Sequence, residues 1–200
     1  MTSEHLHTAI EVKALDRYFG PIHAVRNISF SVNRGEVLGF LGPNGAGKST
    51  TMKMITGFLE PSQGAVLVNG LNVVEAPLKA KSSIGYLPEG APSYGEMTVL
   101  KFLEFIAEIR GYHGSEKRER VNRAIQQINL ESVVDQTIDT LSKGFRRRVG
   151  LAQAILHDPD ILIMVTACSI VALLVLFPIA WLLGRQTPRV GLPTLEAAPA

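Results

Sequence analysis

Gly42-Pro-Asn-Gly-Ala-Gly-Lys-Ser-Thr50 is the stretch that decides the fold, because it matches the pattern G-x-x-x-x-G-K-[ST] of the phosphate-binding P-loop. The preceding run, Gly35–Leu41, is short and largely apolar, which is typical of a buried strand. The following run, Ser49–Thr56, can form a helix. Strand, glycine-rich loop and helix are the context that this motif requires, so the sequence predicts a nucleoside triphosphate site.

The residue types of the loop fit that chemistry. Glycine at positions 42, 45 and 47 lets the backbone turn tightly, so that several N–H groups and the positive end of the helix dipole meet at one anion. Lys48 adds a compact positive charge for the β and γ phosphates. The Ser49 hydroxyl can bind Mg²⁺, which favours one or two protein oxygens together with phosphate.

Composition sets wider bounds. The 200 residues suffice for one medium domain or for a domain with an appendage, and the net charge of +2 argues neither for nor against nucleic acid. The single cysteine, Cys168, excludes an internal disulfide framework. The first seven residues contain no apolar core, so we expect no secretory signal there.

The rest of the chain divides into strands and helices. Alternating apolar and polar residues predict half-exposed strands, with an aromatic turn at Arg17–Pro21 between the first two. Asn69-Gly70 is a strong hairpin signal after a strand. Helical spacing of apolar residues follows Thr98, a suitable N-cap, and a charged helix comes next. The expected strands are 10–15, 24–32, 65–70 and 83–88, and the expected helices are 98–109 and 115–128.

Two further motifs extend the pattern, Leu87-Pro-Glu89 and Leu141-Ser-Lys-Gly-Phe145. In this order, after the aromatic turn and the P-loop, they resemble the nucleotide-binding subunit of an ABC transporter over about residues 8 to 164. The spellings look closest to bacterial multidrug or gliding-motility type exporters. The resemblance implies an ATP-binding subunit that hydrolyses ATP to drive export, with ATP and Mg²⁺ as cofactors.

The resemblance also implies roles for particular residues. Phe19 would stack on adenine, with Tyr18 as the alternative; both rings could instead belong to the core. Glu89 stands where glutamine is commoner, in a loop that senses Mg²⁺. Ser142 and Gly144 would face the γ-phosphate of ATP held by a second subunit in a head-to-tail dimer. The implied cofactor-binding residues are Phe19, Gly42, Pro43, Asn44, Gly45, Ala46, Gly47, Lys48, Ser49, Thr50, Glu89, Ser142 and Gly144, with Ser49 and Glu89 as metal ligands.

The chain departs from the family after Met164. Val165 and Thr166 occupy the places of the Asp-Glu pair that helps to hold Mg²⁺ and activates water, and no histidine follows His157 to contact the γ-phosphate. No catalytic residue is therefore identified. The alternative to a working ATPase is a truncated or chimeric remnant that binds nucleotide without hydrolysing it. The run Arg146-Arg-Arg148 fits a solvated helix face better than a phosphate contact.

The C-terminal part is apolar. Residues 161–184 carry no charge, which predicts an apolar and possible transmembrane helix over 165–185, followed by a disordered Pro- and Ala-rich tail over 186–200. The other reading is that this run does not insert into a membrane. Trp181 and Arg185 resemble interfacial anchors.

These observations predict an α/β fold. It would comprise a P-loop parallel sheet, an N-terminal antiparallel β layer, a helical insert and the apolar C-terminal helix, with the ATP-binding domain spanning residues 1–164 as an incomplete unit. The expected partners are a second nucleotide-binding subunit and membrane-spanning subunits, without nucleic acid. The expected location is the cytoplasmic face of the cell membrane, with the apolar helix as a possible anchor.

Overall fold

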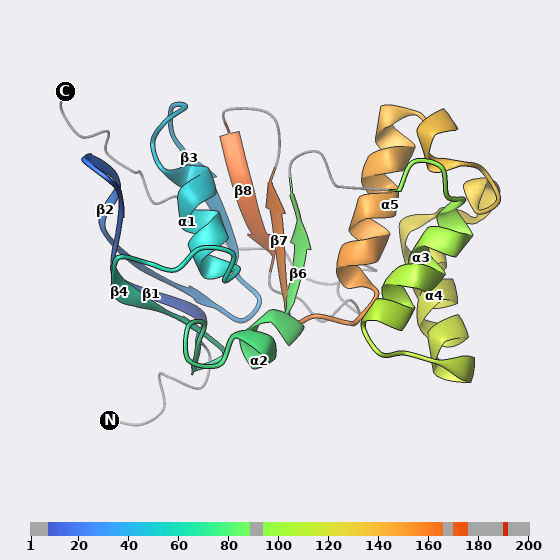
Figure 1. Ribbon diagram of the computed structural model, residues 1–200, viewed down its shortest axis with the longest axis horizontal. Helices are drawn as coiled ribbons and strands as arrows, with labels where there is room; N and C mark the ends of the chain where they lie inside the picture. The colour runs from blue at the N-terminus through green and yellow to red at the C-terminus, as the bar shows by residue number, and fades with distance from the viewer. Residues whose placement is uncertain (1–7, 89–93, 166–169, 176–189, 192–200) are drawn as a thin grey trace. The chain divides into compact units, whose positions relative to one another are not determined.

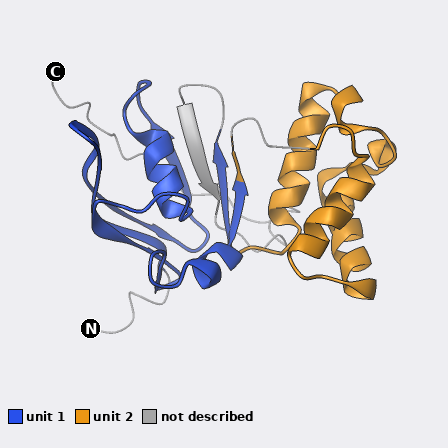
Figure 2. Cartoon of the chain, viewed as in Figure 1, with its two compact units in different colours: residues 1–86, 160–200 blue, residues 87–159 orange. Residues whose placement is uncertain are grey.

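The computed structural model describes residues 8–88, 94–165, 170–175 and 190–191. The chain divides into two compact units: unit 1 comprises residues 1–86 and 160–200, and unit 2 comprises residues 87–159 (Figure 2). The predicted domain boundary at residue 164 stays a prediction.

Unit 1 contains an antiparallel sheet in the order β2-β1-β4-β5 (Figure 1). Its strands are β1 (Thr8–Phe19), β2 (Ile22–Asn33), β4 (Gln63–Val68) and β5 (Leu71–Asn72). The hairpin predicted at Asn69-Gly70 is confirmed, because both residues have positive φ, 49° and 77°, as a type I′ turn requires. The N-terminal antiparallel β layer is therefore confirmed.

The first hairpin differs from the expected turn at Arg17–Pro21. β1 continues through Phe19, and Gly20 and Pro21 alone connect it to β2, so Tyr18 and Phe19 lie on a strand. The pairing of β1 with β2 is irregular, with register shifts that include the stretch around Ala14, whose φ is 45°. Such irregularities bend a strand and redirect its side chains.

The second sheet of unit 1 has the order β6-β7-β8-β3-β9, and the prediction that it is parallel is wrong. Strand β8 pairs antiparallel with both β7 and β3, while β3 and β9 pair in parallel. A parallel connection needs a crossover of a dozen or more residues, and only four residues separate β7 from β8. The strands are β3 (Val37–Leu41), β6 (Ile84–Leu87), β7 (Ile161–Val165), β8 (Ile170–Val175) and β9 (Val190–Gly191).

The predicted apolar helix over 165–185 is wrong where the structure can test it. Val165 ends β7 and residues 170–175 form β8, whereas 166–169 and 176–185 lie outside the described residues. In the described part of the chain, no helix is long and apolar enough to cross a membrane. A short apolar run fits a buried strand as well as a helix, and the β-branched Ile170, Val171 and Val175 favour the strand. In the predicted disordered tail, residues 190–191 form β9 and the others lie outside the described residues.

The hydrophobic core of unit 1 joins the antiparallel sheet, β3, β7 and helix α1 (Lys48–Ile55). Its largest members are almost fully buried, which anchors the two ends of the P-loop in packed structure. They include Ile10, Leu15, Phe40, Met52, Met54, Ile55, Ile161 and Ile163. Helix α2 (Pro77–Ser82) adds Ala80 to the same core.

Unit 2 is helical, which confirms the predicted insert. It contains α3 (Val99–Ile109), α4 (Gly114–Ile128), α5 (Lys143–Ile155) and the short 3₁₀ helices η2 (Glu131–Val133) and η3 (Ile138–Thr140). Thr98 is the N-cap of α3, as predicted, and its hydroxyl accepts a hydrogen bond from the Lys101 N–H. Apolar side chains from all three α-helices are buried, among them Phe102, Leu103, Val121, Ile125 and Val149.

Candidate functional site: the P-loop and the β1–β2 hairpin

The P-loop connects β3 to α1, so the strand–loop–helix context predicted for Gly42–Thr50 is present. Phe40, near the end of β3, and Met52, in α1, are 1% exposed. The loop between them is more accessible: Pro43, Asn44, Gly45 and Ser49 are exposed, and the other residues from Gly42 to Thr50 are half-buried. A buried strand and a buried helix thus hold an accessible loop between them.

Gly47 must be glycine for two independent reasons. Its φ is 80°, in the left-handed region that side chains disfavour. A Cβ at this position would also lie 2.5 Å from the Ala24 carbonyl oxygen and 3.1 Å from Val25 Cγ2. The start of β2 therefore packs directly against the backbone of the P-loop, although 23 positions of sequence separate Ala24 from Gly47.

The N-terminus of α1 remains available to an anion. The N-cap is Gly47, which has no side chain to cap the helix, and the first turn contains no acidic residue. Thr51 is the first residue whose N–H returns to the helix, at 2.8 Å from the Gly47 carbonyl oxygen. The N–H groups before it have no partner within the helix, so they and the helix dipole favour a negatively charged ligand.

The side chain of Lys48 reaches back to the beginning of the same loop. Its ammonium group donates hydrogen bonds to the carbonyl oxygens of Gly42, at 2.6 Å, and Pro43, at 2.7 Å. An ammonium group has three donors, so this arrangement fixes the charge beside the α1 N-terminus and leaves one donor for a phosphate oxygen. The positive charge and the open N–H groups lie within the same nine residues.

A magnesium ion fits this site as a partner of phosphate. Ser49, in the first turn of α1, is exposed, and its hydroxyl is a suitable single protein ligand. Among the described residues, no group of three or more His, Cys, Asp or Glu side chains could hold a metal ion alone. This donor set suits Mg²⁺, which commonly keeps several waters and binds phosphate oxygens.

Two aromatic rings lie at the end of β1. Phe19 is 43% exposed and Tyr18 is 41% exposed, so neither is a core residue. The Arg17 guanidinium lies 4.7 Å from the centre of the Phe19 ring, and the Tyr18 ring stacks on His23 with 4.0 Å between centroids. Phe19 pairs with Ile22, two residues before the Ala24 carbonyl that contacts Gly47. The hairpin therefore brings exposed aromatic surface towards the P-loop.

The sequence analysis missed the close contact between Asp16 and His23, whose imidazole stacks on the Tyr18 ring. His23 Nε2 lies 2.6 Å from Asp16 Oδ1, and the same oxygen accepts the Asn27 N–H at 3.0 Å. The Asn27 hydrogen bond, followed by the hydrogen bond and charge of His23, holds the pKa of Asp16 below its ordinary value. The sequence offered no signal for this contact, because it depends on the irregular register in which β1 pairs with β2.

The remaining predicted residues lie in unit 2 or outside the described residues. Glu89 is among the latter. Ser142 is the N-cap of α5, and its hydroxyl accepts the Phe145 N–H at 3.3 Å. Gly144 is exposed in the first turn. The three arginines that follow are exposed, and the Arg148 guanidinium lies 5.2 Å from the Phe145 ring centre.

The position expected for the acidic pair is described only in part. Val165 is half-buried at the end of β7 and pairs with Ala172 of β8. Thr166 lies outside the described residues. A valine side chain can neither carry charge nor accept a proton, so the structure supplies no general base at Val165.

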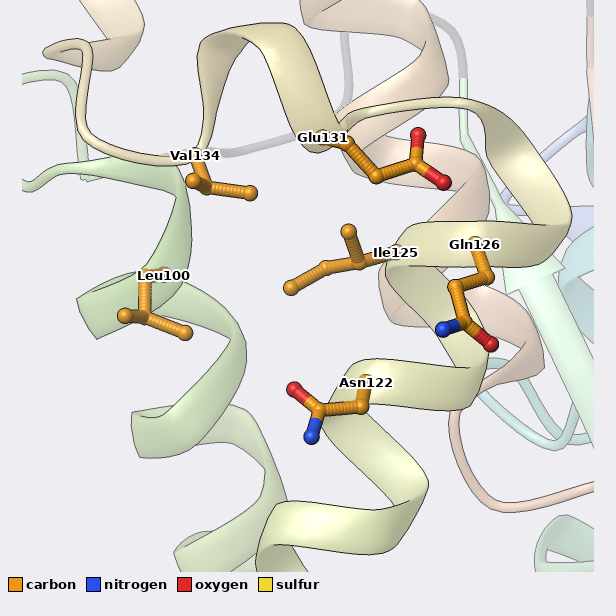
Figure 3. Close-up of a pocket in the computed structure, with 6 residues that line it drawn as sticks. All are labelled: Leu100, Asn122, Ile125, Gln126, Glu131 and Val134. Carbon is orange, nitrogen blue, oxygen red and sulfur yellow. The ribbon is translucent and has the colours of Figure 1, made fainter.

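A separate hollow of about 260 Å³ lies within unit 2 (Figure 3). Leu100 of α3 and Ile125 of α4 point towards one another across it, with Val134 nearby. The other lining side chains are polar: Asn122, Gln126 and Glu131. None of the residues predicted to bind nucleotide lines this hollow.

Comparison with known proteins gives a consistent result. A family model described as ABC transporter matches residues 25–164. The chain is 40% identical over 157 residues to a probable multidrug ABC transporter ATP-binding protein, YbhF of Escherichia coli (strain K12), covering 78% of this chain and 27% of that protein. It is 36% identical over 143 residues to the ABC transporter ATP-binding protein NatA of Bacillus subtilis (strain 168), covering 71% and 58%.

Solved structures agree with these relatives. CbiO1 from Clostridium perfringens, described as part of the ABC transporter complex cbiONQ, superposes with a TM-score of 0.72 at 28% identity, covering 79% of this chain and 65% of that one. An ATP-binding subunit of an ABC transporter superposes with a TM-score of 0.69 at 32% identity, covering 78% and 65%. The chain thus spans about a quarter of YbhF and 58% of NatA.

Proposed function

Because this chain belongs to the ABC transporter family, we propose that it binds Mg·ATP at Gly42–Thr50 and acts as an ATP-binding subunit that powers export. The observation that carries the proposal is the arrangement at the start of α1. Gly47 leaves the helix N-terminus without a side-chain cap, and Lys48 holds its charge beside it. Both features favour a polyphosphate with its magnesium ion.

The base of the nucleotide is assigned to the end of the β1–β2 hairpin. Phe19 is the proposed stacking residue, and Tyr18 is the alternative. Support comes from the exposure of both rings and from the contact of Ala24 with Gly47, which places this hairpin against the P-loop. A purine needs only a flat aromatic face to stack upon.

The proposed partners follow from the family. Ser142 and Gly144 would complete the site of a second nucleotide-binding subunit, and Glu89 would lie in the loop that responds to Mg²⁺. Membrane-spanning subunits would carry the transported molecule, with this chain at the cytoplasmic face of the membrane. A multidrug-type exporter is the proposed class, because YbhF is described as a probable multidrug transporter protein. Anchoring by an apolar helix finds no support, because β8 occupies residues 170–175.

A second candidate function is nucleotide binding without turnover. The observation that favours it is Val165, an apolar residue at the end of β7 where the family resemblance expects an acid. Phosphate release under saturating Mg·ATP separates the two candidates. Turnover that disappears in Lys48→Ala would support the ATPase, whereas binding without turnover, alone or after addition of an intact subunit, would support the second candidate.

The binding proposal is tested with a matched pair of lysine variants on α1. We expect Lys48→Ala to weaken Mg·ATP binding by about 10-fold or more, because a hydrogen bond to a charged group contributes about 1.5–3 kcal/mol. Lys53→Ala removes an exposed lysine near the end of the same helix and should leave the affinity within about 2-fold. Equal affinities for Lys48→Ala and the unmodified chain, measured by calorimetry, would contradict the proposal.

A further inference from the structure

The β1–β2 hairpin contains a stack of three side chains, in which His23 contacts Asp16 through its ring nitrogen and Tyr18 through its ring face. His23 Nε2 contacts Asp16 Oδ1 at 2.6 Å, and the Tyr18 ring lies on the imidazole with 17° between the planes. The Asp16 residue is 9% exposed, and the His23 side chain is 26% exposed. A close pair of polar groups with one buried member restricts both partners, so the imidazole presents a fixed face to Tyr18.

The Asp16 carboxylate is itself fixed by the backbone. Its Oδ1 accepts the N–H of Asn27, a residue with a φ of 44° in the irregular part of β2. The carbonyl oxygen of Asp16 accepts the Ser62 N–H at 2.9 Å, and the Ser62 hydroxyl accepts the Tyr18 N–H at 3.1 Å. The stack is therefore tied both to β2 and to the chain segment before β4, and it does not depend on a single contact.

The stack is adjacent in sequence to the residue that supports the P-loop. His23 immediately precedes Ala24, whose carbonyl oxygen would lie 2.5 Å from a Cβ on Gly47. Tyr18 immediately precedes Phe19, and both rings keep about two-fifths of their surface exposed. One short hairpin thus carries an exposed aromatic pair at its end and a contact with the phosphate-binding loop just beyond.

We propose that the Asp16–His23 pair is a positioning device for the nucleotide base: it holds Tyr18, and through Tyr18 the aromatic end of the hairpin, in register with the P-loop. The inference rests on the proposed binding of ATP. His23 is a positioning residue in this account, because it acts through the aromatic residues and does not touch the phosphates. A platform that is already ordered before the ligand arrives loses less conformational freedom on binding, which favours affinity for the base.

The test compares two ligands that share phosphates but differ in the base, Mg·ATP and Mg·tripolyphosphate. We expect His23→Ala to weaken Mg·ATP binding by about 5-fold and to leave Mg·tripolyphosphate within about 2-fold, since only the former uses the hairpin. His113→Ala, an exposed histidine of unit 2, is the matched control and should change neither affinity. Lys48→Ala should weaken both ligands.

Further variants separate positioning from general damage. The pair Asp16→Asn and His23→Ala should be non-additive for Mg·ATP, because each removes the same interaction. If His23→Ala does not fold, as judged by circular dichroism, His23→Gln answers the same question through the ratio of the two affinities. Unchanged Mg·ATP affinity, or an equal loss for both ligands, would overturn the inference. Failure of the unmodified chain to bind either ligand would instead overturn the proposed function.

Discussion

Two helices of this chain begin in opposite ways. Helix α1 begins after Gly47, which has a left-handed backbone conformation and no side chain to cap the helix, and its first turn ends at the buried Thr51. Helix α5 begins after Ser142, whose hydroxyl accepts the N–H of Phe145. One N-terminus leaves its N–H groups to a ligand, and the other satisfies one of them with its own chain.

The difference separates a binding site from a stabilising cap. A serine cap stabilises the helix that it begins. The glycine before α1 provides no such cap, but it can adopt the left-handed conformation that lets the loop backbone approach an anion. We therefore expect substitutions at Gly47 to affect both folding and nucleotide binding. Substitutions at Ser142 should affect folding alone in the isolated chain, because its proposed phosphate belongs to a second subunit.

The largest effect is expected from Gly47→Ala. The left-handed conformation and the contact with the Ala24 carbonyl together should lower the free energy of unfolding by about 3 kcal/mol and abolish Mg·ATP binding. Gly45→Ala is the matched control, because its φ is 87° but, among the described residues and apart from its two chain neighbours, no atom lies within 4 Å of the added Cβ. It should cost only about 1 kcal/mol. Urea unfolding measures both, and equal losses would contradict the packing argument.

A smaller effect is expected from Ser142→Ala. Loss of the cap should lower the free energy of unfolding by about 1 kcal/mol, and Mg·ATP binding by the isolated chain should stay within about 2-fold. Ser115→Ala, an exposed position in the first turn of α4, should change stability by less than about 0.5 kcal/mol. If Ser142→Ala weakened Mg·ATP binding in the single chain as strongly as Lys48→Ala, the contrast between the two helix starts would be wrong.

The smallest effect concerns acid pH. The pKa of Asp16 is lowered in the folded chain by the Asn27 N–H and by His23, so Asp16 stabilises the fold above its unfolded pKa of about 3.9. That contribution is lost as the pH falls through the lowered folded value. Asp16→Asn should therefore be less stable than the unmodified chain at pH 7, and the difference should shrink below about pH 4. Unfolding at both pH values measures this, and a difference that does not change with pH would contradict the assignment.

Local patterns in the sequence predicted the parts of the molecule that local physics determines. The P-loop between strand and helix, the Asn69-Gly70 hairpin and the cap at Thr98 each depend on a few consecutive residues. Their backbone conformations follow from glycine, asparagine and hydroxyl chemistry at fixed positions. The prediction of a nucleoside triphosphate site came from the glycine and lysine spacing and from the flanking strand and helix, whereas ATP came from the resemblance to the ABC transporter family.

Longer-range features were not predictable in the same way. The apolar run after Met164 is compatible with a helix or a buried strand. The antiparallel pairing of β8 with β3 joins residues that are 129 to 138 positions apart in sequence. The Asp16–His23 contact needs the bulged register of β1 against β2, which no periodicity reveals. Sequence reasoning therefore found the phosphate site but not the polar pair beside its aromatic neighbours.

The most direct test of the central claim is amide hydrogen exchange on the 200-residue chain, with and without saturating Mg·ATP. The account predicts that exchange slows at residues 45–50, where the α1 N–H groups gain a phosphate partner, and stays unchanged at residues 143–146 in the monomer. Protection at residues 143–146 without protection at residues 45–50 would contradict the account. So would identical exchange at both helix starts with and without the nucleotide.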